Sequence, residues 1–374
     1  MLQQCAACET WQYPPRDVCE RCLAAALQWQ APPPDGELLA DTTLHTSSNV
    51  YFRERTPWRT GSVRLHCGPV IICHVHDDCS VGDTVALTAR LDRAGQGVLM
   101  ALPQPLTQQW EYDAQLRELG CSPRHRRVLI TDARATHTPA LAEALLSAGA
   151  TRIFVGESES WRFWRGRDAL QRISGIELMP LDVTDTRSVQ QLAAEIGGKT
   201  DILINNTGFV RDGDALSCKD THFARMQMDV HYFGLMHLIQ AFAPVMQARA
   251  TDGVNNAIAW VNLLSAYALA PVPEFGCFAA ANAAARALLL SLRNTMRSEG
   301  IRVTALYTGP DESDWYQPLP PPKMSDSLLV RRTIDALQTG VEDVYCGDVA
   351  SDIHERTRRD AKVLELELAT NGKG

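Results

Sequence analysis

The chain has 374 residues, of which 45% are hydrophobic and 21% charged, and its formal net charge at pH 7 is -8. The length allows more than one domain, and the negative charge argues against a nucleic-acid groove or an anionic membrane as the main partner. The first residues lack the basic and apolar regions of a secretory signal, and no apolar stretch approaches the roughly 18 residues that span a bilayer. We therefore expect a cytoplasmic protein with reduced cysteines.

Four cysteines in residues 1–30 form two pairs with CxxC spacing, namely Cys5 with Cys8 and Cys19 with Cys22. In a reducing compartment this spacing is typical of a zinc site, because each pair turns two thiolates toward one metal ion. Four sulfur ligands leave no position for water, so we expect a structural zinc ribbon. The alternative, four free cysteines in a core, is disfavoured because both pairs lie in one short polar segment.

Residues 31–105 have the pattern of a small all-β domain. After the breaker segment APPPDG, short β runs alternate with turn residues from Glu37 to about Leu102. A five-stranded barrel would use this length. Residues 106–126 are expected to be a linker that contains one short helix.

From Arg127 the pattern changes to buried strands that alternate with helices. The expected strands are RVLITDA, TRIFVG, IELMPLDV, DILINN, AIAWVNLL and IRVTALY. A helix capped by Thr138 follows the first strand, and long helices are expected at residues 222–246 and 278–299. This order predicts an α/β, doubly wound parallel sheet over residues 127–355, with its site at the carboxyl ends of the strands. Residues 356–374 are expected to be a C-terminal tail.

Several further residues accompany the cysteine pairs: Trp29, the segment PDGELLADTTLH, Pro57, Gly68 to Val70, Gly82, Asp83 and Val85. Together they resemble the family that joins a rubredoxin-like zinc ribbon to an OB-fold barrel, over about residues 1–105. Members of that family accompany thiolases and related acyl-CoA enzymes. The resemblance therefore implies acyl-CoA handling and a thiolase-type partner.

The second half carries a different set of motifs. The sequence NNTG begins at Asn205 and ends at Gly208, and LDVTD contains Asp182 and Val183. With VNLLS, which ends at Ser265, these residues resemble the short-chain dehydrogenase/reductase family, whose domain is Rossmann-like. The resemblance runs from Arg127 to about Asp352. It implies cofactor contacts at Asp182, Val183, Asn205 and Gly208 and a retained catalytic serine at Ser265.

The glycine-rich turn of that family is altered. Its pattern T-G-x-x-x-G-x-G lets the backbone approach a pyrophosphate at a helix N-terminus. Here the three glycine positions hold Asp132, Thr136 and Thr138. Their side chains occupy the phosphate path, and Asp132 adds a negative charge that Arg134 partly offsets. A looser turn that still binds NAD(P) is the alternative, and we expect no tight dinucleotide binding.

The acid/base pair of the family, Tyr-x-x-x-Lys, is also replaced. Counting from Ser265, the tyrosine position holds Phe278 and the lysine position Asn282. A phenylalanine has no hydroxyl to exchange a proton, and an asparagine has no charge to lower the pKa of a tyrosine. The asparagine position in the preceding long helix holds His231. Packing in a helix interface is the favoured interpretation of His231, and a substitute role for His231 or Tyr267 is the alternative.

The end of the second strand of the sheet, Gly156-Glu157-Ser158, offers no basic residue for a phosphorylated cofactor. An aromatic and basic group follows it, made of Trp161, Arg162, Trp164 and Arg165. This group either covers the altered groove, faces a partner or forms a solvated surface.

Three hypotheses remain. The first is a non-catalytic accessory subunit, a pseudoenzyme scaffold fused to an acyl-CoA module, that partners a thiolase or an SDR-type subunit, itself included. The second is an atypical NAD(P)-dependent oxidoreductase for a ketoacyl-CoA or hydroxyacyl-CoA substrate. The third is a sensor that binds acyl-CoA or a nucleotide. The altered glycine turn and the pair Phe278 and Asn282 favour the first.

Overall fold

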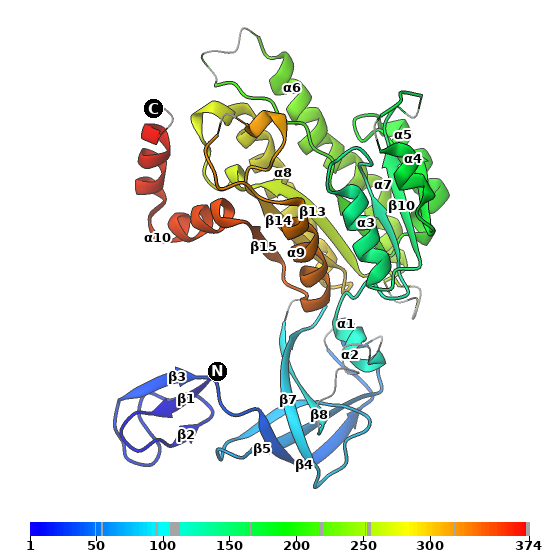
Figure 1. Ribbon diagram of the computed structural model, residues 1–374. Helices are drawn as coiled ribbons and strands as arrows, with labels where there is room; N and C mark the ends of the chain where they lie inside the picture. The colour runs from blue at the N-terminus through cyan, green and yellow to red at the C-terminus, as the bar shows by residue number, and fades with distance from the viewer. Residues whose placement is uncertain are drawn as a thin grey trace. The chain divides into compact units, whose positions relative to one another are not determined.

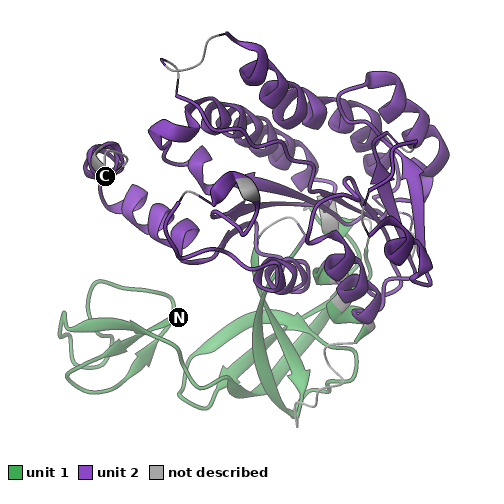
Figure 2. Cartoon of the chain, turned by 45° about the horizontal axis from the view of Figure 1, so that its top comes forward, with its two compact units in different colours: residues 1–92, 96–120 green, residues 93–95, 121–374 purple. Residues whose placement is uncertain are grey.

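The computed structural model describes residues 1–48, 50–53, 55–93, 96–104, 113–159, 161–164, 166–214, 216, 220–250, 252, 256–317 and 319–371. The chain divides into two compact units (Figure 2). The first comprises Met1–Asp92 with Gln96–Gly120, and the second Arg93–Gly95 with Cys121–Gly374. Arg165, part of the predicted linker (106–112) and the last three residues of the predicted tail lie outside the described residues.

The first unit holds a three-stranded antiparallel sheet and a closed barrel, as the β patterns predicted (Figure 1). The small sheet has the order β2-β1-β3, and the barrel the order β4-β5-β6-β8-β7. Along β5, Val63 and Leu65 are buried while Arg64 between them is exposed, the alternation expected of a strand with one inward face. The strands are β1 (Leu2–Cys5), β2 (Trp11–Gln12), β3 (Leu27–Gln30), β4 (Asp35–Leu44), β5 (Trp58–Leu65), β6 (Val70–Val75), β7 (Thr84–Leu91) and β8 (Gly97–Pro103), with helices α1 (Val50–Arg53) and α2 (Ala114–Leu119).

The second unit is built on a seven-stranded parallel sheet of order β11-β10-β9-β12-β13-β14-β15 (Figure 1). The predicted doubly wound sheet is thus confirmed. The strands are β9 (Arg127–Ile130), β10 (Arg152–Glu157), β11 (Ile176–Pro180), β12 (Ile202–Asn205), β13 (Ala259–Ser265), β14 (Arg302–Thr308) and β15 (Asp343–Cys346). The strand order steps outward from β9 in both directions, so β9 and β12 flank the point where a ligand crevice forms in such sheets.

Helices cover both faces of this sheet and form a core on each. One core contains Val189 of α5, Leu238 of α7 and Leu289 of α8, and the other contains Leu141 of α3 and Leu329 of α9. The helices are α3 (Thr138–Ser147), α4 (Arg167–Arg172), α5 (Thr186–Ile196), α6 (His222–Met228), α7 (Gly234–Ala248), α8 (Gly276–Arg297), α9 (Asp326–Thr339) and α10 (Asp348–Asn371).

Three details differ from the predictions. Thr138 is the first residue of α3, not its cap, and its Oγ1 donates a hydrogen bond to Asp132 O at 2.6 Å. The predicted long helix at 222–246 is interrupted by a π-helical turn, Asp229–Phe233, between α6 and α7. Most of the predicted tail belongs to α10, whose helical geometry breaks at Asp360.

One helical segment of the described chain, Pro273–Arg297, is long and apolar enough to cross a membrane by length and composition. The sequence led us to expect no such stretch. The segment contains α8, which buries Ala285 and Leu289 against the sheet and Phe278 in a separate aromatic cluster. A core helix rich in alanine and leucine passes the same test, so the segment is weak evidence for a membrane.

Candidate functional site

The four cysteines of the ribbon converge as predicted. Their Sγ atoms all lie within 4.8 Å of one another. The distances from Cys5 Sγ to Cys22 Sγ and from Cys8 Sγ to Cys19 Sγ are both 3.6 Å. A tetrahedral zinc ion with Zn–S bonds of roughly 2.3 Å places its sulfurs about 3.8 Å apart. The four residues therefore fit zinc.

Buried glutamine side chains tie the two knuckles together. Gln12 on β2 donates from Nε2 to Gln3 Oε1 at 2.9 Å, and its Oε1 accepts the backbone N–H of Glu20 at 3.0 Å. Gln3 Oε1 also accepts the backbone N–H of Arg16 at 2.8 Å. These bonds join the strand next to the first pair of cysteines to the loop that carries the second pair.

In the second unit, a side chain of the protein itself makes hydrogen bonds to the turn between β9 and α3. Asn206, which follows β12, accepts the backbone N–H of Asp132 at 2.8 Å and donates to Asp132 O at 3.1 Å. Its Nδ2 also donates to Thr138 Oγ1 at 2.8 Å. The backbone N–H and C=O of Asp132 are therefore both bonded to Asn206 within the protein.

The charges around this turn are mostly negative. Loss of water around the partly buried Asp132 raises the pKa of its carboxyl group. Arg134 partly offsets this charge as expected, since its charge and its backbone N–H, 2.8 Å from Asp132 Oδ1, both lower the pKa of Asp132, while its guanidinium also donates to Glu159 Oε2 at 3.1 Å and to Ser158 O at 2.9 Å. His137 is buried at the start of α3, where burial lowers its pKa, and the carboxylates of Asp311 and Asp326 act on it. Thr136, the third altered position, is exposed.

Sequence reasoning missed the role of Glu157, the last residue of β10. In dinucleotide-binding folds an acidic residue near this strand end binds the ribose hydroxyls. Here the buried Glu157 carboxylate accepts two hydrogen bonds from Arg167, at 2.6 and 3.0 Å, and one from Trp164 Nε1 at 2.7 Å. The acid at a strand end, followed by an arginine, was the signal in the sequence.

The residues of the aromatic and basic group after β10 lie in different surroundings. Trp164 points to Glu157, whereas Trp161 is 80% exposed. Arg162 Nη1 lies 3.3 Å from Glu159 Oε2. Trp164 therefore packs at the end of β10, while Trp161 faces solvent.

The remaining predicted cofactor contacts also have partners within the chain. Asp182 Oδ1 accepts the backbone N–H and the Oγ1 hydroxyl of Thr184 at 2.9 and 2.7 Å. Asn205 Nδ2 donates to Asn262 Oδ1 at 2.7 Å. Val183 is buried, and a Cβ at Gly234 would come within 2.9 Å of it. Gly208 lies next to the ring of His231.

The four predicted catalytic positions come together at the carboxyl end of β13. Asn282 is 1% exposed; its Oδ1 accepts the backbone N–H of Ser265 at 2.9 Å, and its Nδ2 donates to Phe278 O at 3.0 Å. The ring of Phe278 meets that of His231 at a centroid distance of 5.3 Å. Burial lowers the pKa of His231 to about 4, and its Nε2 lies 3.1 Å from Phe209 O. The contacts of His231 with Phe278 and Phe209 support the interpretation that it packs in a helix interface.

A tyrosine that the sequence analysis did not single out lies at Ser265. The Tyr316 hydroxyl interacts electrostatically with the Ser265 side chain, and burial raises the pKa of Tyr316 above its ordinary value. Tyr316 is 6% exposed, and its ring lies 5.4 Å from that of Phe275. Ser265 Oγ also accepts the backbone N–H of Tyr267 at 3.2 Å. The serine hydroxyl thus lies between the backbone of Tyr267 and the side chain of Tyr316.

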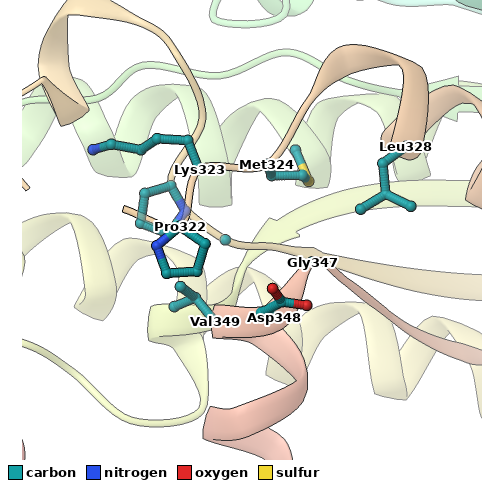
Figure 3. Close-up of a pocket in the computed structure, with 9 residues that line it drawn as sticks. Pro322, Lys323, Met324, Leu328, Gly347, Asp348 and Val349 are labelled. Carbon is teal, nitrogen blue, oxygen red and sulfur yellow. The ribbon is translucent and has the colours of Figure 1, made fainter. Parts of the chain in front are cut away.

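A small cavity of about 70 Å³ opens beside this cluster, at the ends of β14 and β15. Ligand pockets for small molecules usually measure roughly 300–1,000 Å³. In Figure 3 the Lys323 side chain extends away from the Asp348 carboxylate, so the lining offers no convergent polar pair. The cavity lining consists of Gly309, Pro310, Pro322, Lys323, Met324, Leu328, Gly347, Asp348 and Val349.

Three family profiles match the chain. The rubredoxin-like zinc ribbon domain of ChsH2 matches residues 1–28, and the C-terminal OB-fold domain of ChsH2 matches residues 29–90. The short chain dehydrogenase profile matches residues 126–322, just over half of the chain.

Curated relatives match the second unit. Dehydrogenase/reductase SDR family member 6 of Rattus norvegicus is 31% identical over 192 residues, which are 49% of this chain and 74% of the rat protein. Dehydrogenase/reductase SDR family protein 7-like of Anopheles gambiae is 30% identical over 190 residues. That match covers 49% of this chain, which spans only 58% of the Anopheles protein.

Solved structures agree with the fold. A short chain dehydrogenase from Burkholderia cenocepacia J2315, in complex with NADP, is 27% identical with a TM-score of 0.59, covering 66% of this chain and 98% of that one. A short-chain dehydrogenase from Streptomyces avermitilis, at 22% identity and a TM-score of 0.55, covers 67% of this chain and 98% of that one and shows the fold alone. With its profile matched over more than half of its length, this chain belongs to the short-chain dehydrogenase family and carries zinc-ribbon and OB-fold domains of the ChsH2 type ahead of that domain.

Proposed function

We propose that this chain is a non-catalytic accessory subunit in acyl-CoA metabolism. Its zinc-ribbon and OB-fold module (residues 1–105) handles acyl-CoA and contacts a thiolase-type enzyme, and its dehydrogenase-type domain (residues 127–355) is a scaffold for an SDR-type partner. One observation carries the proposal: the lysine position holds the uncharged Asn282, which is 1% exposed and is held by hydrogen bonds to Ser265 N and Phe278 O.

The cofactor path supports the same conclusion. A pyrophosphate carries negative charge and needs free backbone N–H groups at a helix N-terminus. Here the N–H of Asp132 is bonded to Asn206, and the Asp132 carboxylate lies beside it. Glu157, which would hold the ribose, is bonded to Arg167 and Trp164. Tight binding of NAD(P) is therefore not expected.

The exposed face of α8 supports an SDR-type subunit contact. Small residues lie exposed along this face at three- and four-residue spacing, namely Ala280, Ala283, Ala287 and Ser291. Residues at this spacing share one side of a helix, and small side chains allow a second helix to approach closely. The partner is an SDR-type subunit, either a second copy of this chain or a catalytically complete relative.

Affinity purification from native cells tests the partners. The tagged full chain should capture a thiolase-type enzyme, an SDR-type enzyme or both. A Cys5→Ser/Cys8→Ser variant should lose the thiolase and keep the SDR-type subunit, because only the ribbon is disrupted. If the full chain captures neither enzyme, or if the variant captures the thiolase unchanged, the accessory role is wrong.

The second candidate is an atypical NAD(P)-dependent oxidoreductase acting on a ketoacyl-CoA or hydroxyacyl-CoA. Two observations favour it: the Tyr316 hydroxyl at Ser265, and the 27% identity to a dehydrogenase whose structure contains NADP. Steady-state assays of the full chain with NADH and NADPH and a ketoacyl-CoA decide between the two, with an active family member as the positive control. Ordinary turnover would establish this candidate in place of the first.

A sensor of acyl-CoA or nucleotide remains the third candidate. Calorimetric titration of the full chain with NADH, NADPH and acetyl-CoA separates it from the other two. Binding of a nucleotide without turnover, and without a captured enzyme, would favour the sensor.

A further inference from the structure

Arg211, which follows β12, is held among three aromatic rings. The guanidinium carbon lies 3.7 Å from the centroid of the Trp315 ring and 4.7 Å from that of Phe209. The ring of Phe223, on α6, lies 5.6 Å away. Aromatic faces attract a guanidinium group and fix its plane. The three rings come from separate segments of the chain, so tertiary structure orients this arginine.

The charge of Arg211 has no counterpart in the described part of the protein. Its side chain makes one hydrogen bond, from Nη1 to Val210 O at 3.2 Å, and the ion pairs among the described residues do not include it. By contrast, Arg167 pairs with Glu157 and Arg293 with Asp343. A guanidinium has five N–H donors, so most donors of Arg211 are available to an acceptor.

The buried side chain of Gln227 contacts the backbone of Arg211. Gln227 is 1% exposed and donates from Nε2 to Arg211 O at 2.9 Å. Its Oε1 is buried and has no hydrogen-bond partner among the described residues. An unpaired buried acceptor destabilises a protein by roughly 1–3 kcal/mol. The buried Gln227 thus fixes the backbone of Arg211, while the guanidinium donors remain available to an oxyanion.

The location suits a ligand. Arg211 follows β12 and Trp315 follows β14, so both lie at the carboxyl edge of the parallel sheet, where ligands of such sheets bind. Trp315 directly precedes Tyr316, which packs with Phe275 and Phe278 in the aromatic cluster beside Ser265. The aromatic clamp, as we call Phe209, Phe223 and Trp315 around Arg211, thus lies at the rim of the aromatic cluster over Ser265.

We propose that Arg211 in its aromatic clamp anchors an oxyanion of an acyl-thioester ligand. The proposal rests on the acyl-CoA part of the proposed function and assigns it a residue in the dehydrogenase-type domain. A planar, oriented guanidinium binds a carboxylate or a phosphate through two parallel hydrogen bonds. The oxyanion is either a phosphate of the nucleotide carrier or a carboxylate on the acyl group.

Calorimetry on the full-length, zinc-loaded chain tests the proposal. Acetyl-CoA, S-acetylpantetheine and succinyl-CoA are titrated into the wild type, Arg211→Gln and Arg211→Lys. An Arg211→Gln change should weaken the cognate ligand roughly 10- to 100-fold, the usual effect of losing a charged hydrogen-bonded pair. Arg211→Lys should recover only part of that affinity, because lysine keeps the charge and lacks the planar pair of donors.

The ligands identify the source of the oxyanion. If it is a carrier phosphate, acetyl-CoA binds the wild type and S-acetylpantetheine does not. If it is an acyl carboxylate, succinyl-CoA binds more tightly than acetyl-CoA and only this difference disappears in Arg211→Gln. Arg172→Gln, which removes an exposed arginine on α4, is the matched control and should bind as the wild type does.

Two results would overturn the proposal: no binding of any of the three ligands by the wild type, or an affinity for every one of the three ligands that is equal in wild type and Arg211→Gln. Thermal unfolding of each variant shows whether the fold is kept. If Arg211→Gln does not fold, the decision rests on Arg211→Lys, which retains the cation among the rings. Turnover with NADPH would refute the accessory role but leave the Arg211 result standing, so the two failures are distinguishable.

Discussion

The ribbon and the cleft of the parallel sheet both carry motif residues, but the groups that these motif residues contact differ between the two regions. In the ribbon, the sulfurs of Cys5, Cys8, Cys19 and Cys22 lie within 4.8 Å of one another and fit one metal ion. In the cleft, Asn282 and Asn206 lie at motif positions and bond to the protein's own backbone. A motif position indicates a function only when its polar atoms remain available to the ligand.

The largest expected effect is the loss of zinc from the ribbon, which tests the first half of this comparison. The wild type should hold about one zinc per chain, and Cys5→Ser/Cys8→Ser none, because two thiolates do not hold the ion. Structural zinc contributes roughly 10–16 kcal/mol at pH 7, so the ribbon of the variant should unfold. Elemental analysis with thiol titration measures both. The control is Cys67→Ser/Cys277→Ser, which removes two half-buried cysteines outside the cluster. Equal zinc in wild type and Cys5→Ser/Cys8→Ser would contradict the assignment.

The next effect tests whether the cleft of the parallel sheet has catalytic activity. The full chain should not reduce a ketoacyl-CoA with NADH or NADPH, because positioned acid/base catalysis alone is worth roughly 10²–10⁴ in rate. Restoring the pair with Phe278→Tyr/Asn282→Lys should not restore turnover, since Asn206 still occupies the turn and Glu157 is still bound to Arg167. Optical assays of nicotinamide oxidation measure this. Turnover by the double variant alone would show that the cofactor path is open and that only the acid/base pair was lost.

A smaller effect, on the pH dependence of the free energy of unfolding, tests the interpretation that His231 is packed and not catalytic. Burial lowers its folded-state pKa to about 4, below the ordinary value near 6.5. The unfolded chain then binds a proton that the folded chain does not, so stability is complete above pH 6.5 and falls as the pH decreases toward 4. At about 1.4 kcal/mol per unit, the loss is at most about 3 kcal/mol.

His231→Asn should reduce this loss of stability between pH 6.5 and 4. Denaturant unfolding at several pH values measures the difference, with His222→Asn, at an exposed histidine of α6, as the control. Equal pH dependence in wild type and His231→Asn would show that His231 is not buried in the neutral form.

Much of the fold was predicted from the sequence because it depends on local patterns. Continuous apolar runs predicted strands such as Val128 to Ile130, and CxxC spacing predicted the cysteine cluster. The four-residue strand β15 was missed because its apolar run, Val344 to Cys346, is only three residues long, and the strand lies at the edge of the sheet beside β14. The π-helical turn at Asp229–Phe233 was missed because the helical pattern continues through it.

The partners of the cleft residues depend on tertiary structure, which no spacing rule supplies. Tyr316 lies far along the chain from Ser265, and nothing near it in sequence marks it as a partner. Glu157 and Arg167 were visible individually, but only the fold shows that the carboxylate is paired. The sequence therefore identified which motif residues were replaced, and the structure was needed to show what occupies their place.

The smallest effect concerns the interaction between the side chains of Tyr316 and Ser265. If Ser265 is retained to hold Tyr316, then Tyr316→Phe and Ser265→Ala should couple by about 1 kcal/mol in a double-mutant cycle of unfolding free energies. Ser265→Ala alone should cost more than Tyr316→Phe, because it also leaves the backbone N–H of Tyr267 without its acceptor. The control cycle pairs Ser265→Ala with Tyr345→Phe, and the two changes should be additive within about 0.5 kcal/mol. Additivity of Tyr316→Phe with Ser265→Ala would mean that the serine hydroxyl is available to a substrate, and the cleft would then resemble that of an oxidoreductase more than that of a scaffold.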